Sequence, residues 1–537
     1  MSKYDFNPKH HQTKLLSILK ELSAAKKLTS KLYQKILKKH PKNKSDIFSK
    51  SEVISAIRHF KHPQRLIAKI QAKPIRTMSG VVPVTLLTKP YPCPGKCIFC
   101  PNDPNMPKSY LSSEPGAQRA ALNRFDPYHQ VYNRLKAYYS NGHTTDKAEL
   151  IVLGGTWSAY PVKYKIWFIK HCFDALNDFQ PGKIKKLTNP KITGVSNWES
   201  LKKSQLKNQT ASARCIGLSL ETRPDFISKS QLIEFRKLGC TKVQIGIQSL
   251  DNQVLKLNKR GHSIKETQEA INLLRLAGFK IQAHWMANLY GSNPKEDIAD
   301  FKKLFSQKLY RPDELKIYPT SLIASAELNS YYQKGLWQPY SQNQLLKVLT
   351  AILPTIPEYC RVTRVIRDFS SDDIVVGNKA TNFRQIVEKE IANKGKTIQE
   401  IRVREIRQKK VSLKDLKLKT ITYQTATSTE KFFQFVTSSN QIAAFLRLSL
   451  PKLKPFISEL KSSAIIREIH VYGQALSLGE KAKTQHLGLG TKLISKAKTT
   501  SQKNHYKKLS VISAIGTMPY YRSRGFKDGQ LYQHLNV

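Results

Sequence analysis

The clearest shortage in this 537-residue chain is of acidic residues. It holds 38 Asp and Glu against 90 Lys and Arg, a formal net charge of +52 at pH 7. The electrostatic field of such a positive charge attracts polyanions, and counterion release adds to the binding affinity an amount that decreases with salt. A lysine-rich proteome would raise the charge everywhere, but the first fifty residues concentrate 13 Lys against 3 acids. We therefore expect a nucleic-acid partner.

Long apolar runs are also missing. We find no run of roughly eighteen apolar residues, and the first residues, MSKYDFNPKHHQTKLL, contain no apolar core of a signal peptide. The basic N-terminal segment is not joined to a strongly amphipathic Trp or Phe face, which favours nucleic acid over a membrane. We expect a cytoplasmic protein without a membrane partner.

Cysteine is scarce, and its odd count of seven argues against a disulfide framework. Three of the seven lie in Cys93-Pro-Gly-Lys-Cys97-Ile-Phe-Cys100, just after a strand-like VVPVTLL. Three thiolates from one tight loop can hold three irons of a 4Fe–4S cluster and leave the fourth iron for S-adenosylmethionine (SAM). Reductive cleavage of SAM then yields a 5′-deoxyadenosyl radical. Zinc is the alternative, but it needs a fourth ligand and no second Cys pair lies nearby.

The length and the hydrophobic pattern predict several domains. Residues 1–72 show apolar residues at helical spacing and form a small basic helical module. From 73 to 365, short strands alternate with helices, which predicts a parallel sheet, either open or closed into a partial barrel. Within it, the polar stretch 183–209 is expected to be an exposed loop. A charged linker, 366–409, leads to a final domain, 410–537, with antiparallel-looking strands, a Gly-rich turn and a helix.

Candidate ligand-binding residues lie at or near the ends of the predicted strands. Paired glycines there let the backbone approach a ligand, SAM in this case, although such a pair is often only a turn. Polar side chains at these ends line the mouth of a parallel barrel, where ligands bind; ordinary solvation is the alternative. The candidates are Gly154, Gly155, Thr156, Glu221, Thr222, Arg223, Gln244 and Gln248.

A second group of candidates lies in the last domain. The turn QHLGLG connects the strand IREIHVYG to a helix, and its backbone N–H groups suit a pyrophosphate; a plain helix-entry turn is the alternative. A tyrosine hydroxyl some thirty residues later could act as a general acid towards a departing thiolate, or the paired rings could simply pack. The turn candidates are Gln485, Gly488, Leu489 and Gly490, the tyrosines are Tyr520 and Tyr521, and Glu468 and His470 are weaker candidates.

These segments together resemble the catalytic subunit of Elongator in its stand-alone microbial form. The likeness runs over nearly the whole chain, and its motifs include CPGKCIFCPNDPNMPKSYLSSEPGAQRA, ELIVLGGTW, IGLSLETRPD, GCTKVQIGIQS, NKRGH, LKIYPT, RVTRVIRD, IREIHVYG, QHLGLG and GTMPYYRSRGF. The resemblance implies an α/β multidomain protein: a radical-SAM partial (β/α) barrel followed by a GNAT-type acetyltransferase domain. It also implies conversion of the tRNA wobble uridine, in the anticodon stem-loop, to 5-carboxymethyluridine.

The resemblance also assigns roles to residues. The three cysteines would hold the cluster, the strand-end residues would bind SAM, and Gly488 and Gly490 would cradle acetyl-CoA. Tyr520 or Tyr521 would assist thioester breakdown, and Lys316 would face the cleft. The radical would abstract hydrogen from the acetyl methyl, the carbon radical would add to uridine C5, and thioester hydrolysis would leave the carboxymethyl group.

Two departures from the family pattern stand out. Ala287 and Tyr290 occupy positions where the family has proline, so this strand-end loop could differ in shape. The linker lacks a cysteine-rich cluster, so no structural zinc is expected. The sequence does not identify the electron donor or the oligomeric state.

Two other functions compete with this one. A protein lysine acetyltransferase with a structural cluster is disfavoured, because a chain of charge +52 repels lysine-rich tails. A non-catalytic tRNA-binding protein is disfavoured by the intact cysteine, glycine and tyrosine motifs.

Overall fold

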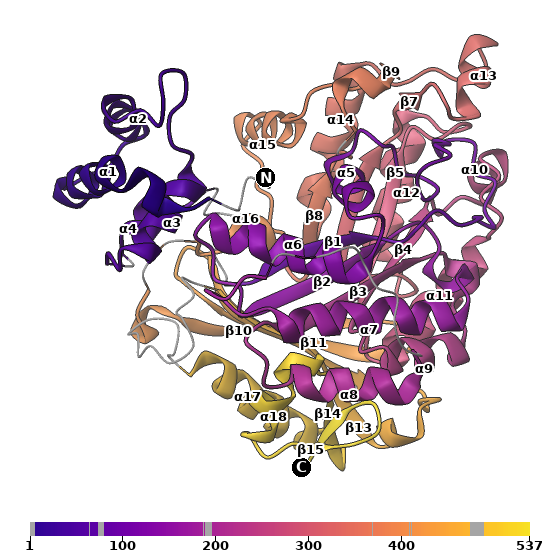
Figure 1. The fold of residues 1–537 in the computed structure, drawn as a ribbon. Helices are drawn as coiled ribbons and strands as arrows, with labels where there is room; N and C mark the ends of the chain where they lie inside the picture. The colour runs from indigo at the N-terminus through magenta and orange to yellow at the C-terminus, as the bar shows by residue number, and fades with distance from the viewer. Residues whose placement is uncertain are drawn as a thin grey trace.

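The computed structural model describes residues 6–63, 65–72, 80–185, 187, 196–367, 369–407, 409, 411–472 and 488–537. An N-terminal helical lobe lies beside a body that contains two large sheets (Figure 1). No helix in these described ranges is both long and apolar enough to cross a bilayer.

The first sheet is entirely parallel, with strand order β1-β2-β3-β4-β5-β6-β8. Its central strands β4 and β5 are almost fully buried, as expected where helices cover a parallel sheet, whereas buried and half-buried residues alternate along β1 and β2. Because β1 and β8 are the two edges, the sheet is an open partial barrel, and the predicted fold class is confirmed. The strands are β1 (Val82–Leu87), β2 (Lys147–Leu153), β3 (Arg214–Thr222), β4 (Lys242–Gln248), β5 (Lys280–Ala287), β6 (Glu314–Pro319) and β8 (Arg361–Val365).

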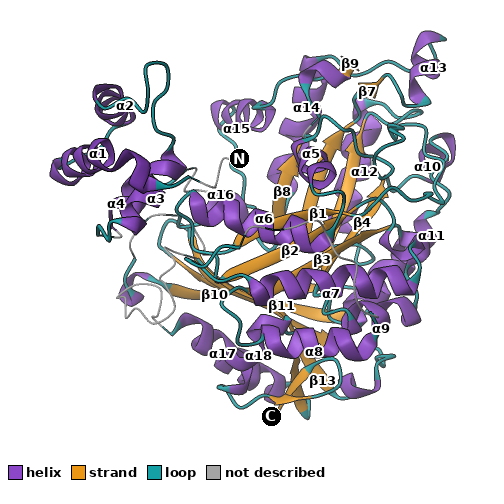
Figure 2. Cartoon of the chain, viewed as in Figure 1, coloured by secondary structure: helices purple, strands orange, loops and turns teal. Residues whose placement is uncertain are grey.

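Helices connect these strands, and most of them cover the outside of the sheet (Figure 2). Several begin at side-chain caps, such as the capping box of Ser263 and Glu266. They are α5 (Pro115–Leu122), α6 (Pro127–Ser140), α7 (Val162–Asp178), α8 (Trp198–Asn208), α9 (Lys229–Lys237), α10 (Asn252–Leu257), α11 (Ile264–Leu276), α12 (Pro294–Ser306), α13 (Leu328–Gln333) and α14 (Gln342–Ile352). A two-stranded ribbon, β7 (Leu322–Ile323) with β9 (Ile374–Val376), lies outside the sheet.

The expectation of a loop over 183–209 was wrong for its second half, which forms helix α8. The helix has a weak apolar pattern because its inner face buries polar side chains. Asn208 is fully buried; its amide donates to the Ala213 carbonyl and its oxygen accepts from the Cys215 N–H. These hydrogen bonds, which hydrophobic periodicity cannot reveal, satisfy the buried polar groups.

Residues 366–409, expected as a linker, contain β9, α15 (Phe383–Asn393) and α16 (Ile401–Arg404). Arg384 donates to the Val362 carbonyl and to the Glu400 carboxylate, so this segment packs on β8. The domain boundaries themselves stay predictions.

The second sheet is mixed, with order β10-β11-β12-β13-β14-β16-β15. Only β13 and β14 pair in parallel, and they pair over four residues, ending at Ile466 and Val511. Beyond that point the two strands separate. The elements are β10 (Lys417–Gln424), β11 (Ser428–Val436), β12 (Ile442–Pro451), β13 (Ser463–Val471), α17 (Leu489–Lys503), β14 (Lys508–Val511), α18 (Met518–Arg522), β15 (Lys527–Asp528) and β16 (Gln533–Asn536).

Buried ion pairs join the second sheet to the amino-terminal ends of the barrel strands. Arg467 donates both terminal nitrogens to Asp313, at 2.6 and 2.7 Å, and both side chains are fully buried. Lys280 at the start of β5 pairs with Glu468 of β13 at 2.7 Å. Removing one partner of such a pair leaves a buried charge uncompensated, so the relative placement of the two sheets is well specified.

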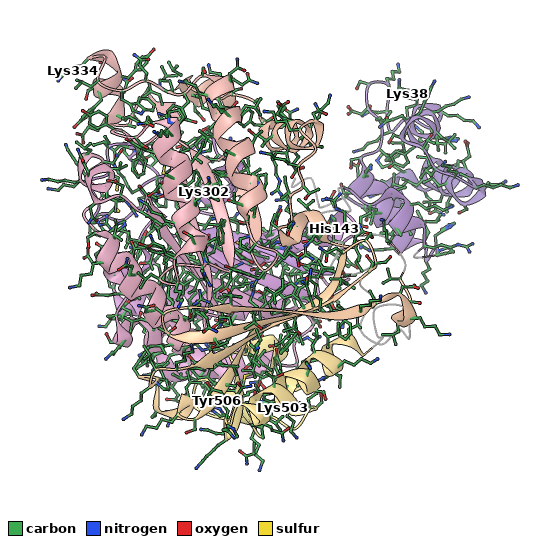
Figure 3. The ribbon with its side chains drawn as sticks, turned by 180° about the vertical axis from the view of Figure 1, so that it is seen from behind. Lys38, His143, Lys302, Lys334, Lys503 and Tyr506 are labelled. Atoms are coloured by element: carbon green, nitrogen blue, oxygen red, sulfur yellow. The ribbon has the colours of Figure 1, made fainter. Side chains whose placement is uncertain are left out.

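The N-terminal lobe has a separate apolar core, formed by α1 (Gln12–Ala24), α2 (Ser30–Lys39), α3 (Lys50–His59) and α4 (Arg65–Ile70). It contacts the body at the end of α6, where Arg58 stacks on the Tyr139 ring at 3.6 Å and Gln71 bonds to His143 at 2.7 Å. Figure 3 labels His143 near this junction and Lys38 on the lobe. The charged faces of its helices, rich in lysine, point to solvent, as expected for a polyanion-binding module.

Candidate functional site

One cavity of about 1470 Å³ brings most of the candidate residues together. It runs from the carboxyl ends of the barrel strands, through the barrel interior, to the separated strands of the second sheet. Gly154, Gly488, Leu489, Gly490 and Tyr520 are not among its lining residues, and Gln485 lies outside the described residues. The candidates that line it are Cys93, Cys97, Cys100, Gly155, Thr156, Glu221, Thr222, Arg223, Gln244, Gln248, Lys316, Glu468, His470 and Tyr521.

The cysteine loop lies at the carboxyl-end mouth of this cavity. Cys93 Sγ accepts the Gly95 N–H at 3.4 Å and lies 3.7 Å from the Thr156 hydroxyl. Cys97 Sγ accepts a hydrogen bond from Arg260 Nη1 at 3.0 Å. Contacts with Cys100 and Arg260 hold the pKa of the Cys97 thiol well below its usual range. Thiolate is the form that binds iron.

The donor set of this loop fits an iron–sulfur cluster better than a single ion. All three thiols are free. In the described part of the chain, no three His, Cys, Asp or Glu side chains form a ready-made site for one metal ion. A cluster does not require the three thiolates to surround one point, because each thiolate binds a different iron. Zinc, in contrast, needs four ligands around one centre.

The strand-end residues surround this loop. A side chain at Gly154 would place its Cβ 1.9 Å from the Thr88 hydroxyl, so this glycine allows β1 and β2 to end side by side. Arg223 forms a bidentate ion pair with Asp225, at 3.0 and 2.8 Å. Its remaining nitrogen, Nη1, is buried without a hydrogen-bond partner among the described residues and faces Gly95. An orphaned donor beside the cysteine loop is suited to an anionic ligand group.

A polar cluster lies inside the barrel. Lys316 Nζ donates to Gln244 Oε1 at 2.5 Å, and His284 Nε2 lies 3.3 Å from the same oxygen. Glu221 accepts the Tyr110 hydroxyl at 2.9 Å and lies 3.7 Å from His284 Nδ1. Burial lowers the pKa of His284 well below its usual range, so this ring is neutral near pH 7.

Lys316 should be reactive near neutral pH. Burial, with the nearby positive charge of Arg364, lowers the pKa of its amine to about 8. The amine is therefore protonated below that pH and mostly neutral and nucleophilic above it, whereas ordinary lysines become neutral near pH 10.4 (about two units higher). Reductive methylation followed by peptide mass spectrometry should give a labelling midpoint near pH 8 at Lys316. A profile identical to that of the bulk lysines would contradict this expectation.

The other end of the cavity lies where β13 and β14 separate. Glu468 is paired with Lys280 and with Arg447, at 2.7 and 2.8 Å, while the His470 ring stacks on Phe445. Tyr521 on α18 lines this end and is 5% exposed. Burial raises the pKa of Tyr521, which keeps its hydroxyl protonated and able to donate.

The glycine turn and Tyr520 lie together near this end. Gly488, with φ 67°, is the N-cap of α17, and Gly490 lies in the first turn. A Cβ at Gly490 would lie 2.4 Å from the Tyr520 hydroxyl, so that hydroxyl covers the N-terminal turn of the helix. Tyr520 is 36% exposed and stacks against Arg524. No side chain of the described residues caps this helix start, and its first N–H groups suit a phosphate-containing ligand.

Sequence reasoning missed two residues of the site, His284 and Arg260. His284 of β5 pairs in register with Lys316 of β6. The sequence feature that could have revealed it is a polar residue that alternates with apolar ones in the strand KIQAHWMA. Arg260 lies in the NKRGH motif, but its sulfur partner is 163 positions away. No local pattern indicates such a contact.

Two family models match adjoining parts of the chain. The Radical SAM superfamily matches residues 91–305, and the Radical_SAM C-terminal domain matches residues 312–393. Together, the two matches cover the cysteine loop and the barrel strands from β2 to β8.

Similar proteins cover most of the chain. A tRNA uridine(34) acetyltransferase of Methanocaldococcus infernus is 35% identical over 86% of this chain and 86% of its own length. That of Dehalococcoides mccartyi is 36% identical over 86% of this chain and 99% of its own. Elongator complex protein 3 of Homo sapiens is 32% identical over 86% and 85%. The solved structure of M. infernus Elp3 lacking residues 1–46 has a TM-score of 0.73 and 32% identity, and covers 86% of this chain and all of that one.

Proposed function

The chain belongs to the family of the tRNA uridine(34) acetyltransferases and Elongator complex protein 3, and we propose that it modifies the wobble uridine of tRNA. The reaction is radical-SAM chemistry that adds an acetyl-CoA-derived carboxymethyl group to uridine C5. The single observation that supports it best is the continuous cavity, because cysteine-loop residues and Tyr521 line the same space. A reaction that joins a radical to an acetyl group needs both ends in one enclosed volume.

At the mouth of the cavity, Cys93, Cys97 and Cys100 would hold a 4Fe–4S cluster. With SAM bound, this cluster supplies a 5′-deoxyadenosyl radical. Arg223 Nη1, orphaned beside the cysteine loop, would bind the SAM carboxylate. Gly155, Thr156, Glu221, Thr222 and Gln248 complete the proposed SAM site.

Inside the barrel, Gln244 lies about 13 Å below the carboxyl end of β4, by the rise of a strand over four residues, and Lys316 on β6 reaches it through Nζ. They offer a donor and an acceptor to the reacting groups. Gln244 is almost fully buried, which limits the contact of bulk water with a reactive intermediate at this depth.

At the other end, acetyl-CoA would bind with its pyrophosphate on the first turn of α17 and its thioester between β13 and β14. Gly488, Leu489 and Gly490 would present backbone N–H groups to the pyrophosphate, while Gln485 of the same motif lies outside the described residues. Tyr521 would protonate the departing thiolate when water cleaves the thioester, and Tyr520 would hold the pantetheine arm. Glu468 and His470 border this pocket.

The tRNA would bind through its anticodon stem-loop at the cavity mouth and through phosphate contacts of the N-terminal lobe. We place the activity in the cytoplasm, with a separate electron donor. Phosphate contacts position RNA without reading its sequence.

Deleting residues 1–72 should weaken tRNA binding and flatten its salt dependence. The slope of log affinity against log salt should fall by roughly 0.7 to 0.9 for each phosphate that the lobe neutralises. A gel-shift series at several salt concentrations measures this, and the archaeal relative solved without residues 1–46 indicates that the body folds alone. Unchanged affinity and slope would place the RNA site on the barrel.

Anaerobic reconstitution tests the whole proposal. The chain is incubated with SAM, acetyl-CoA, a reductant and unmodified tRNA, and the nucleosides are analysed by mass spectrometry. A uridine that gains a carboxymethyl mass supports the substrate, the co-substrate and the reaction together. Formation of 5′-deoxyadenosine without modified uridine would contradict the tRNA assignment, and acetylated lysine peptides in place of both would favour a protein acetyltransferase.

A further inference from the structure

We propose that Arg260 is a positioning residue of the iron–sulfur site, whose hydrogen bond to Cys97 raises the reduction potential of the cluster. This inference rests on the proposed function, because it requires a cluster on the cysteine loop. It concerns how readily that cluster accepts an electron.

The contact between Arg260 and the loop is short and enclosed. Nη1 lies 3.0 Å from Cys97 Sγ, and Nη2 donates to the Gly246 carbonyl at 2.6 Å. The Arg260 side chain is buried, with 5% of the residue exposed. A planar guanidinium anchored through one nitrogen directs the other in a fixed direction, here towards the sulfur.

The backbone also holds Arg260 in place. The Ile98 N–H, inside the cysteine loop, donates to the Asn258 carbonyl at 3.3 Å, so the two loops are joined next to the contact. The Arg260 carbonyl accepts from Arg223 Nη2 at 2.8 Å. Gly246 leaves room for the guanidinium, because a Cβ there would lie 2.9 Å from Arg260 Nη2.

The charge of Arg260 lacks a carboxylate partner. Arg223 is neutralised by Asp225, but no Asp or Glu of the described residues lies within the 4 Å of an ion pair with Arg260. Burying an unpaired cation is costly. The thiolates of the cysteine loop therefore balance the positive charge of this guanidinium.

This arrangement favours the reduced cluster. One-electron reduction adds a negative charge next to a fixed positive charge and strengthens the N–H···S hydrogen bond. Hydrogen bonds to sulfur and local net charge both set cluster potentials. Arg260 thus lets a weaker reductant deliver the electron that SAM cleavage requires.

Redox titration of reconstituted variants, followed by EPR of the reduced cluster, tests this role. In Arg260→Gln the ratio of reduced to oxidised cluster at a fixed poise should fall about tenfold, equal to about 59 mV for a one-electron couple. Arg260→Lys should shift it less. The control Arg402→Gln removes a guanidinium that lines the same cavity but bonds the Thr363 carbonyl, and should leave the ratio unchanged. A wild-type ratio in Arg260→Gln with full iron content would overturn the proposal.

A second measurement detects the contact itself. The full chain labelled with ¹⁵N-arginine is reduced without SAM, and pulsed EPR should detect a ¹⁵N coupling to the cluster that is weaker in Arg260→Lys, in which Arg223 Nη1 still lies beside the loop. A wild-type cluster without that coupling overturns the role of Arg260 alone. A wild-type chain that binds no cluster overturns the proposed function as well.

Discussion

Replacing Cys97 with alanine should abolish both 5′-deoxyadenosine formation and uridine modification. Three thiolates hold three of the four irons and leave one iron open for SAM. The loss of Cys97 leaves the cluster only two protein ligands. The fold should survive, because Cys97 lies in a loop that packs in a small cluster apart from the barrel core. Iron content and nucleoside mass spectrometry measure the effect.

The matched control is Cys172→Ala on α7. Cys172 is fully buried in the main core, and burial raises the pKa of its thiol well above the usual range, so it is no thiolate ligand. This variant should keep its iron and its activity, with some loss of stability from the small cavity. Full activity in Cys97→Ala would remove the radical mechanism.

Replacing Tyr521 with phenylalanine should lower acetyl-CoA turnover by about 10²-fold or more, the usual contribution of a general acid. The substitution removes one oxygen and keeps the ring packed against Phe526 and Tyr520. Burial raises the pKa of Tyr521 and keeps its hydroxyl protonated at neutral pH, so it can donate its proton to the departing thiolate. Because this proton transfer belongs to the chemical step and not to binding, loss of the hydroxyl should affect kcat more than KM. Thiol release from acetyl-CoA in the presence of tRNA is the measurement.

Tyr520→Phe is the comparison for Tyr521. Its hydroxyl covers Gly490 at the start of α17 and is partly exposed, so its loss should raise KM for acetyl-CoA and change kcat little. SAM cleavage should continue in both variants, which separates the two ends of the cavity. A larger kcat loss in Tyr520→Phe than in Tyr521→Phe would reverse the two roles.

The features that the sequence determined by itself are local. The C-x3-C-x2-C spacing needs only one loop to bring its thiols together, and the buried strands follow from short apolar runs such as KVQIGIQ. The polar edge strand β10, KLKTITYQ, carries no such signal. The start of α17 at its Gly488 N-cap likewise needs only neighbouring residues. Helix α8 escaped this reasoning because hydrogen bonds of buried polar side chains, rather than an apolar stripe, hold it in place.

Tertiary structure decided which distant groups meet. The contact between Arg260 and Cys97 spans 163 positions, and that between Arg467 and Asp313 spans 154. The separation of β13 from β14 and the single cavity through the barrel depend on how two sheets are placed against each other. Hydrogen bonds and ion pairs act over a few ångströms in space, whatever the distance along the chain, so residue spacing carries no record of these partners.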